Sequence, residues 1–352
     1  PGLPGSEPEH TDGGTQRPVQ WYFDNLLPEE RLREAISREA GIKGEDAFAL
    51  LEYLGAESAG ALTLLPPGAA WPAPPSLQPL SDAALSRPFQ GLPRHTLTAQ
   101  APKRMSLAGA QHKLLVVRCP GESVGFNEPE GAAPSTHILK PDHPDASAYP
   151  ASVVNEYVCM RLARAAGLVV PKVHLHHVPE PVYVIERFDR RVEWRGRAAD
   201  GTPELQVQRL HAIDACQLLN KARSFTPAGA SLDALRQIVD RATNKAHTRL
   251  NLYRWLVFNI AIGNDDCHLK NLSFFVRPQG IELAPHYDLL ATGAYYTKAF
   301  ADEKALWPEV PLAIALPGAG TLARVTRQAV VEAGLALGLP KALSQRIVDE
   351  VV

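Results

Sequence analysis

Long apolar runs and an excess of positive charge are both missing from this sequence of 352 residues. No apolar run reaches the roughly 18 residues that a transmembrane helix requires, so we expect no membrane span. The first residues are rich in Pro, Gly and Glu, and they lack the apolar stretch of a signal peptide. We therefore expect a cytoplasmic protein that makes no contact with membranes.

Charge and cysteine content exclude two further classes. The 36 basic and 38 acidic residues give a formal charge of −2, without the basic excess of a protein that binds nucleic acid by itself. Any contact with DNA is therefore expected to be indirect, through a partner. The four cysteines, Cys119, Cys159, Cys216 and Cys267, lie far apart, with neither a disulfide pattern nor the paired spacing of a zinc site.

The first third of the chain reads as helices followed by a linker. Residues 1–20 form a polar tail, and leucine and isoleucine then recur at helical spacing over 21–40 and again over 45–54. Residues 66–93 contain eight prolines, which predict a connecting segment with no long helix or central strand.

A small mixed α/β region is expected next. Its predicted elements are strands at Lys113–Arg118, His137–Lys140 and Val182–Ile185 and a helix at about 151–166. The predicted buried stripe of that helix consists of Val154, Tyr157, Val158 and Leu162.

The second half is predicted to be mainly helical, with one β-hairpin of Leu272–Val276 and Ile281–Ala284. The expected helices lie at about 211–220, 231–241, 249–262, 322–338 and 340–351. This order predicts an α+β, protein-kinase-like fold of two lobes. The small N-terminal lobe is mixed α/β, and the larger C-terminal lobe is mainly helical with an inserted hairpin. The predicted division is a tail (1–20), a helical and linker part (21–100), an N-terminal kinase lobe (101–190) and a C-terminal kinase lobe (191–352).

The segment 263–271, GNDDCHLKN, is the strongest functional signal in the chain. It lies between an apolar helix and a strand, where a polar loop is held by two buried elements. Phosphoryl transfer requires a carboxylate that orients the attacking hydroxyl and oxygen ligands for Mg²⁺. Asp266 and, five positions later, Asn271 supply groups of these kinds. The hairpin then folds Asp288 back toward Asn271, so one base and two hard oxygen ligands are predicted to converge.

Several segments, in one order, resemble those of HipA, the toxin kinase of bacterial type II toxin–antitoxin systems. They are FDNLLPEE (23–30), SLAGAQHK (106–113), STHILKP (135–141), NEY (155–157), ERFDR (186–190), GNDDCHLKN (263–271) and YDLL (287–290). The resemblance implies a serine/threonine protein kinase that uses ATP and Mg²⁺. It also implies an aminoacyl-tRNA synthetase as substrate, and hence growth arrest through blocked translation.

The family's catalytic roles are carried over by position. The resemblance makes Asp266 the catalytic base, and Asn271 and Asp288 the Mg²⁺ ligands. It makes Lys140 the lysine that pairs with the ATP phosphates, which agrees with its place at a strand end facing the predicted cleft. Glu156, on the following helix, is expected to orient Lys140 through an ion pair; the alternative is ordinary surface charge.

Further ATP contacts are expected from three segments. Glu186 and Phe188 match the segment that joins the lobes and holds the adenine, although Phe188 also fits an ordinary core position. His268 and Lys270 are expected either to bind phosphate or to cap the loop. Small residues at Ala108, Gly109 and Ala110, with Gln111, let backbone N–H groups approach a phosphate.

The loop 104–113 matches a family loop whose serine the kinase phosphorylates on itself. Ser106 is the matching position, and a phosphate there is expected to withdraw the loop and stop ATP binding. The alternative is that Ser106 only stabilises the turn.

The resemblance also implies an antitoxin partner of HipB type. HipA-like kinases normally carry a small β-rich subdomain ahead of the FDNLLPE segment, and only about 20 residues precede it here. We expect this part either to be missing from these residues or to be encoded as a separate small chain, like HipS in three-component systems. Two other functions stay open: a small-molecule or lipid kinase of related fold, and a catalytically silent co-repressor scaffold.

Overall fold

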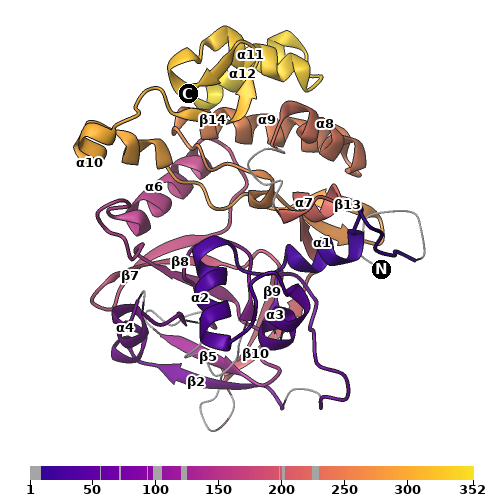
Figure 1. The fold of residues 1–352 in the computed structure, drawn as a ribbon, viewed down its shortest axis with the longest axis vertical. Coiled ribbons are helices and arrows are strands. Elements are labelled where there is room, and N and C mark those ends of the chain that lie inside the picture. Colours follow the sequence, from indigo (N-terminus) through magenta and orange to yellow (C-terminus); the bar gives the residue numbers. More distant parts are fainter. Residues whose placement is uncertain are drawn as a thin grey trace. The chain divides into compact units, whose positions relative to one another are not determined.

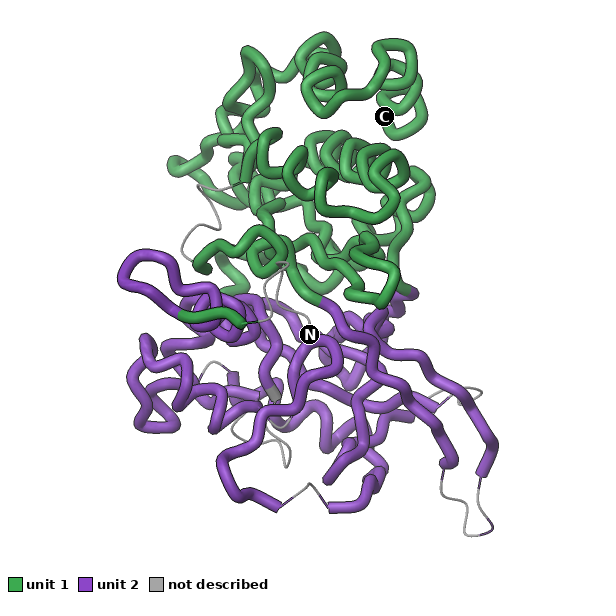
Figure 2. Tube along the Cα trace, turned by 90° about the vertical axis from the view of Figure 1, so that its right-hand side faces the viewer, with its two compact units in different colours: residues 1–11, 145–171, 213–352 green, residues 12–144, 172–212 purple. Residues whose placement is uncertain are grey.

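The computed structural model describes residues 9–55, 57–70, 73–92, 94–97, 105–119, 125–197, 199, 203–223 and 230–352. The chain forms two compact units, which Figure 2 colours separately. The sheet unit consists of residues 12–144 and 172–212, and the helical unit consists of residues 1–11, 145–171 and 213–352. No helix in the described residues is long and apolar enough to cross a membrane.

Three short helices open the sheet unit (Figure 1): α1 (Pro18–Asp24), α2 (Glu30–Ala40) and α3 (Ala47–Leu54). The stretch 21–40 is thus two helices with a break before Glu30, and α1 starts inside the predicted tail. Gly41 ends α2 with a φ of 67°, a left-handed conformation that glycine adopts without steric cost. Leucines of α2, of α3 and of the segment between α1 and α2 share one core, against which Phe23 of α1 packs.

The proline-rich segment is more ordered than the sequence predicts. It contains strand β2 (Ser76–Leu80), which pairs antiparallel with β5 (Phe126–Glu130), and helix α4 (Asp82–Gln90). Ser81 caps α4 by accepting a hydrogen bond from the Ala84 N–H, and Pro88 lies near the helix end. Neither element is a long helix or a central strand, and the prolines fit because an edge strand and a helix end both tolerate proline.

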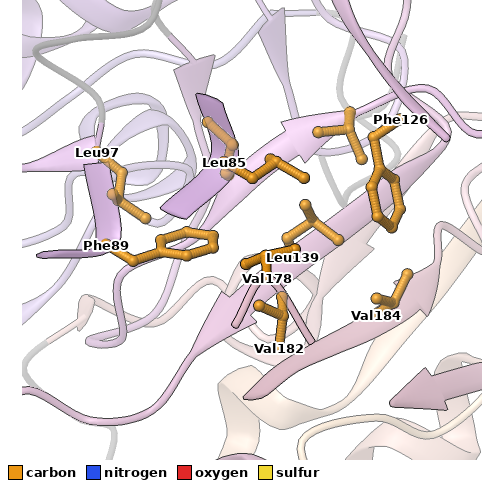
Figure 3. Packing of buried hydrophobic residues seen from close by; sticks show 10 residues of the cluster. Leu85, Phe89, Leu97, Phe126, Leu139, Val178, Val182 and Val184 are labelled. Carbon is orange, nitrogen blue, oxygen red and sulfur yellow. The ribbon is translucent and has the colours of Figure 1, made fainter. Parts of the chain in front are cut away.

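The central sheet of this unit has the strand order β4-β6-β8-β7, all antiparallel. Its strands are β4 (Leu114–Val116), β6 (His137–Pro141), β7 (Val173–His177) and β8 (Pro181–Glu186). Leu85 and Phe89 of α4 pack against Leu139, Val182 and Val184 of this sheet (Figure 3). Three of these strands agree with the predicted runs, and β7 is additional.

A buried ion network joins the end of this sheet to the N-terminal part of the unit. Both Arg187 and Arg190 pair with Glu57, at 3.2 and 3.0 Å, and both pair with Asp189. Glu57 also accepts hydrogen bonds from Ser135. The charged residues of the ERFDR segment therefore mainly form buried ion pairs within the sheet unit. They hold the short strand β1 (Glu57–Ser58), which pairs with β3 (Met105–Ser106).

The remaining strands of the sheet unit form a hairpin that the sequence analysis did not predict. It consists of β9 (Arg190–Arg197) and β10 (Pro203–Arg209), in a region expected to belong to a helical C-terminal lobe. The units therefore differ from the predicted ranges, since residues 145–171 belong to the helical unit and residues 191–212 to the sheet unit.

The helical unit is built around a buried helix, α9 (Lys245–Ala261), whose aromatic side chains Tyr253 and Trp255 are fully buried. Its other helices are α6 (Ser152–Ala165), α7 (Ala215–Leu218), α8 (Leu232–Arg241), α10 (Lys298–Ala301), α11 (Arg327–Ala336) and α12 (Lys341–Val351). Its strands are β11 (Ala212–Asp214, whose first residue belongs to the sheet unit), β12 (Ser273–Arg277), β13 (Gly280–Leu283), β14 (Pro311–Leu316) and β15 (Ala319–Thr321).

Three predictions for this unit differ in detail from the structure. The expected helix at 211–220 is strand β11 followed by the single turn α7, which Asp214 caps together with Gln217. The predicted hairpin is present as β12 and β13, but β14 and β15 form a second one. The helix expected from 322 starts only at Arg327, where Thr326 caps it.

The buried face of α6 is not the predicted one. Val154, Val158 and Leu162 are 41, 45 and 50 % exposed, whereas Glu156 and Met160 are buried. The stripe was predicted from apolar residues at helical spacing, but the neighbouring elements cover a face of α6 that carries a carboxylate. Which face a helix buries depends on what packs against it.

Candidate active site

Asp266 lies in a tight loop between α9 and the hairpin. Its side chain is 68 % exposed, so a large substrate can reach the carboxylate. The loop is folded on its own backbone, because the Asp266 carbonyl accepts hydrogen bonds from the N–H of His268 and from Nδ2 of Asn271, both at 2.9 Å. The two predicted residues of the motif are therefore directly bonded.

Asn264, which the sequence analysis did not single out, holds this loop in place. Its Oδ1 accepts a hydrogen bond from the Asp266 N–H at 3.0 Å and another from the Thr292 hydroxyl at 3.2 Å. Its Nδ2 donates to Oδ1 of Asn259 at 2.7 Å, and Asn259 is fully buried in α9. The Thr292 hydroxyl also accepts from the Asp265 N–H at 2.9 Å. The loop is thus attached both to the core helix and to the segment after Asp288.

Asn271 is buried and lies in a single 3₁₀ turn, Leu269–Asn271. Because its Nδ2 donates to the Asp266 carbonyl, its Oδ1 is the atom suited to bind a cation. This amide oxygen and the Asp288 carboxylate are hard oxygen donors, the ligand type that Mg²⁺ prefers. No cluster of three or more His, Cys, Asp or Glu residues suited to a metal occurs in the described ranges, and the assignment of Asn271 and Asp288 as Mg²⁺ ligands stays a prediction.

Asp288 is held near the motif by its neighbour Tyr287. The Tyr287 hydroxyl lies 2.8 Å from the Ser273 hydroxyl and donates to the Lys270 carbonyl at 2.8 Å, one residue before Asn271. Asp288 itself has a φ of 58°, the left-handed region that non-glycine residues rarely adopt. Strain of this kind is common at functional sites, where the surrounding contacts maintain it.

Lys270 is buried, and its Nζ donates to Oδ2 of Asp214 at 2.9 Å. Asp214 also caps α7, because its Oδ1 accepts from the Gln217 N–H. Of the two roles that the sequence left open, this contact favours bracing of the loop over phosphate binding. His268 is partly exposed, with Nε2 at 3.7 Å from Oδ1 of Asp266.

His286 lies beside the site as a buried ring stacked on Trp255, with the two ring centroids 6.3 Å apart. Its backbone N–H donates to the Val169 carbonyl at 2.8 Å. Burial lowers the pKa of His286 to about 4, so the ring is neutral at physiological pH.

Apart from His268 and Lys270, the predicted nucleotide-binding residues belong to the sheet unit. Lys140 lies on β6, is buried, and places Nζ 5.7 Å from the ring centroid of Tyr183, its partner on β8. Glu186 ends β8 and lies 3.5 Å from Nζ of the exposed Lys172. Phe188 is half-buried. Glu156 is a buried residue of α6 in the helical unit, so the surface alternative does not hold for it. Its pairing with Lys140 stays a prediction.

Ser106 is fully buried, and its hydroxyl donates to the Leu26 carbonyl at 2.7 Å. The following residues are tied to the same part of the chain, because the Glu29 N–H donates to the Gly109 carbonyl at 3.2 Å. Gly109 has a φ of 113°, which requires glycine, and a β-carbon there would lie 2.7 Å from Nζ of Lys113. Ala108 and Gln111 are partly exposed and Ala110 is exposed, whereas Arg104 of the predicted loop lies outside the described residues.

Comparisons with known proteins connect this geometry to one family. The model of the HipA-like C-terminal domain matches residues 105–352, and that of the HipA N-terminal domain matches residues 3–65. The protein Y4mE of Sinorhizobium fredii is 36 % identical over 304 residues, which cover 83 % of this chain and 69 % of that protein. The serine/threonine-protein kinase toxin HipA of Shewanella oneidensis is 30 % identical over 311 residues, covering 84 % and 68 %.

The structural comparison agrees with the α+β fold expected from the sequence. In the complex of Shewanella oneidensis HipA, HipB and operator DNA, the matching chain is 27 % identical and gives a TM-score of 0.76. The match covers 95 % of this chain and 76 % of that one. The chain therefore belongs to the HipA-like family of serine/threonine-protein kinase toxins.

Proposed function

We propose that the chain transfers the γ-phosphoryl group of ATP to a serine or threonine of a protein substrate and uses Asp266 to orient the acceptor hydroxyl. The observation that carries this proposal is a pair of hydrogen bonds that connect the residues of the motif. Asn271 donates to the Asp266 carbonyl, and Tyr287, beside Asp288, donates to the Lys270 carbonyl. These bonds join Asn271 to the Asp266 backbone and the neighbour of Asp288 to the same turn, which supports the convergence of one base and two oxygen ligands.

In this proposal Asn271 and Asp288 hold Mg²⁺, which neutralises phosphate charge when it is bound. The exposed Asp266 carboxylate accepts a hydrogen bond from the acceptor hydroxyl and fixes its direction. The network of Asn264, Asn259 and Thr292 keeps Asp266 in place, so little reorganisation is needed at the moment of transfer.

The proposed ATP contacts are taken from the family resemblance. Lys140 pairs with the phosphates and Glu156 orients it, while the backbone of residues 108–111 covers the phosphates and Glu186 and Phe188 line the adenine site. Lys270 braces the loop, and His268 lies close enough to Asp266 to meet a phosphate oxygen. These roles follow from the family resemblance and agree with the buried position of Lys140.

Ser106 is proposed as a site of self-phosphorylation that switches the kinase off. A phosphate group carries three oxygens and about −1.5 to −2 charges at neutral pH, which cannot be accommodated at a fully buried position. Modification would therefore break the bond from Ser106 to Leu26 and release the loop from the segment it is tied to. The other role considered for Ser106, stabilisation of the turn, fits the same bond.

The proposed physiological role is that of a toxin. The substrate would be an aminoacyl-tRNA synthetase, with arrest of translation and growth as the result. The inhibitory partner would be an antitoxin of HipB type, with an additional small HipS-like chain in a three-component system, and DNA would be contacted only through the antitoxin. The related Shewanella oneidensis protein occurs in a complex with HipB and operator DNA, which supports the partner assignment.

The test is labelling of freshly dephosphorylated protein with γ-labelled ATP and Mg²⁺, followed by mass-spectrometric mapping. We expect label on Ser106 in the wild type, and none in Asp266→Ala or Ser106→Ala. Asp240→Ala, which removes an exposed carboxylate on α8, is the matched control and should label normally. Unchanged labelling of Asp266→Ala would contradict the assignment of the base, and labelling only at other positions would contradict the role of Ser106.

A further inference from the structure

An exposed apolar segment, residues 300–307, runs from helix α10 toward strand β14 in the helical unit. Phe300, Leu306 and Trp307 are 50, 50 and 49 % exposed, although all three are large hydrophobic residues. Exposed apolar side chains that gather in one short segment often mark a binding surface. This segment begins about ten residues after Asp288.

Trp307 is packed against the catalytic loop itself. A β-carbon at Gly263 would lie 3.4 Å from Cζ3 of Trp307, and one at Gly293 would lie 3.2 Å from the same atom. The two glycines are joined to each other, since the Gly293 N–H donates to the Gly263 carbonyl at 2.8 Å. The indole therefore lies on backbone that starts the loop, three residues before Asp266, and half of its surface remains open.

The segment is fastened to the loop at a second point, Tyr296. The Tyr296 carbonyl accepts hydrogen bonds from the N–H groups of Leu306 and Trp307, at 3.0 and 3.1 Å. Burial, together with the negative charge of Asp265 and a hydrogen bond to it, raises the pKa of Tyr296 to about 12. Tyr296 thus connects Leu306 and Trp307 to the residue next to Asp266.

A hydroxyl oriented by Asp266 must approach its exposed carboxylate, so the chain that bears this hydroxyl passes over the neighbouring surface. We propose that Trp307 and Leu306 form a docking surface for an apolar side chain of the protein substrate, next to the serine or threonine that receives the phosphate. This inference rests on the proposed kinase function and adds a specificity-determining surface to it.

The charges of this surface favour a polypeptide over a lipid bilayer. Asp302 and Glu303 are exposed in the same segment, where the exposed Lys298 and Lys304 offset their charge, and Asp265 and Asp266 lie at its other border. The carboxylates of the loop therefore leave this surface with a net negative charge, which the anionic surface of a bacterial membrane would repel, because such a membrane attracts basic segments. A neutral or basic peptide with one apolar anchor suits this combination.

The experiment uses the full chain and two sets of synthetic peptides centred on one serine. In the first set a single leucine is moved along both sides of the serine, and in the second set asparagine takes its place. We expect leucine at one position close to the serine to raise kcat/KM about tenfold over asparagine, the effect of partly burying one leucine side chain. The gain should appear mainly in KM.

Three variants assign the preference to the surface. Trp307→Ala and Leu306→Ser should remove most of the leucine preference, and Trp307→Phe should retain part of it. Phe48→Ala, which removes a 74 % exposed aromatic side chain of α3, is the matched control and should keep the preference. Because Trp307 also packs on Gly263, a general loosening of the loop would lower kcat for both peptide sets equally, whereas lost docking affects the leucine set alone.

The outcomes separate this inference from the proposed function. Phosphorylation of both peptide sets with equal kcat/KM, or a leucine preference that survives both Trp307→Ala and Leu306→Ser, would overturn the docking surface. Protein that labels itself but phosphorylates no leucine peptide would overturn it as well. Absence of any phosphoryl transfer, including self-labelling, would instead contradict the proposed catalytic site.

Discussion

The side-chain amide of Asn155 holds both backbone groups of Ala291: its Oδ1 accepts from the Ala291 N–H at 2.9 Å, and its Nδ2 donates to the Ala291 carbonyl at 3.2 Å. Nδ2 also donates to the Tyr295 hydroxyl at 3.0 Å. Asn155 belongs to α6, and Ala291 follows Asp288 by three residues. This contact fixes the segment that carries Asp288 to a helix far away in the sequence.

Asn155→Ala is therefore expected to displace Asp288 without removing it. Loss of the amide leaves the Ala291 N–H without its acceptor, whereas the Ala291 carbonyl keeps the hydrogen bond from the Ala294 N–H. One unsatisfied backbone group should lower the free energy of unfolding by about 1–3 kcal/mol. Removal of a group that orients a metal ligand typically costs about 10- to 100-fold in metal affinity or activity.

The measurement is kcat as a function of Mg²⁺ concentration, together with urea unfolding. The Mg²⁺ concentration at half-maximal activity should rise in Asn155→Ala. Asn251→Ala removes an amide of α9 that bonds only within its own helix, so it serves as the control. A variant that loses stability but keeps the Mg²⁺ dependence of the wild type would reduce Asn155 to a structural residue.

Asn264 gives a second prediction, which concerns the catalytic loop. Asn264→Ala removes the acceptor of the Asp266 N–H and the bonds to Asn259 and Thr292. Because misplacement of a catalytic group by about 1 Å can cost roughly a hundredfold in rate, we expect kcat to fall by about that factor while ATP binding persists.

Thr292 provides the matched pair for this test. Thr292→Val removes the hydroxyl that bonds both Asn264 and the Asp265 N–H, whereas Thr292→Ser keeps it. Steady-state kinetics should show a lower kcat for the valine variant and nearly wild-type kcat for the serine variant. Equal kcat in the two variants would show that the hydroxyl does not hold the loop.

The pair of Lys270 and Asp214 separates the two roles considered for Lys270. Lys270→Met leaves the Asp214 carboxylate buried without its cation, which is expected to cost about 3–5 kcal/mol of stability. In the double variant Lys270→Met with Asp214→Asn, most of that loss should be recovered, because the asparagine oxygen still caps α7.

Urea unfolding and the KM for ATP are measured on the single and double variants. A bracing role predicts that the double variant regains both stability and its KM for ATP. If the KM for ATP stays raised after stability has returned, Lys270 binds phosphate directly.

The buried His286 predicts how stability depends on pH. Its pKa is about 4 in the folded protein and about 6.5 in an unfolded chain, so the unfolded state takes up the proton first on acidification. The contribution of neutral His286 to the free energy of unfolding amounts to about 3 kcal/mol. It is complete above the unfolded pKa and is lost as the pH falls from about 6.5 to about 4.

His286→Phe keeps an aromatic ring against Trp255 but removes this titration. As the pH is lowered from 7.5 to 5, we expect the free energy of unfolding to fall further for the wild type than for the variant. His247→Phe, at an exposed position of α9, is the control. A difference that does not vary with pH would contradict the role of His286.

Local features of the sequence were sufficient to predict the loop and the hairpin around the catalytic motif, whereas the roles of its residues stay a prediction. Asp266, Asn271 and Asp288 are connected by one turn and one hairpin, and both are formed by residues close together in the chain. The strands His137–Lys140 and Val182–Ile185 were likewise predicted from their apolar runs, since a buried strand needs a short, continuous apolar segment.

The contacts that position these residues were decided only by the tertiary structure. Asn155 meets Ala291, Lys270 meets Asp214, and Glu57 meets Arg187 across 136, 56 and 130 positions of the chain. The face that α6 buries, including Glu156, also depends on its neighbours. A local pattern reports the apolar character of a segment, but the pairing of buried polar groups depends on which distant segments the folded core excludes from water together.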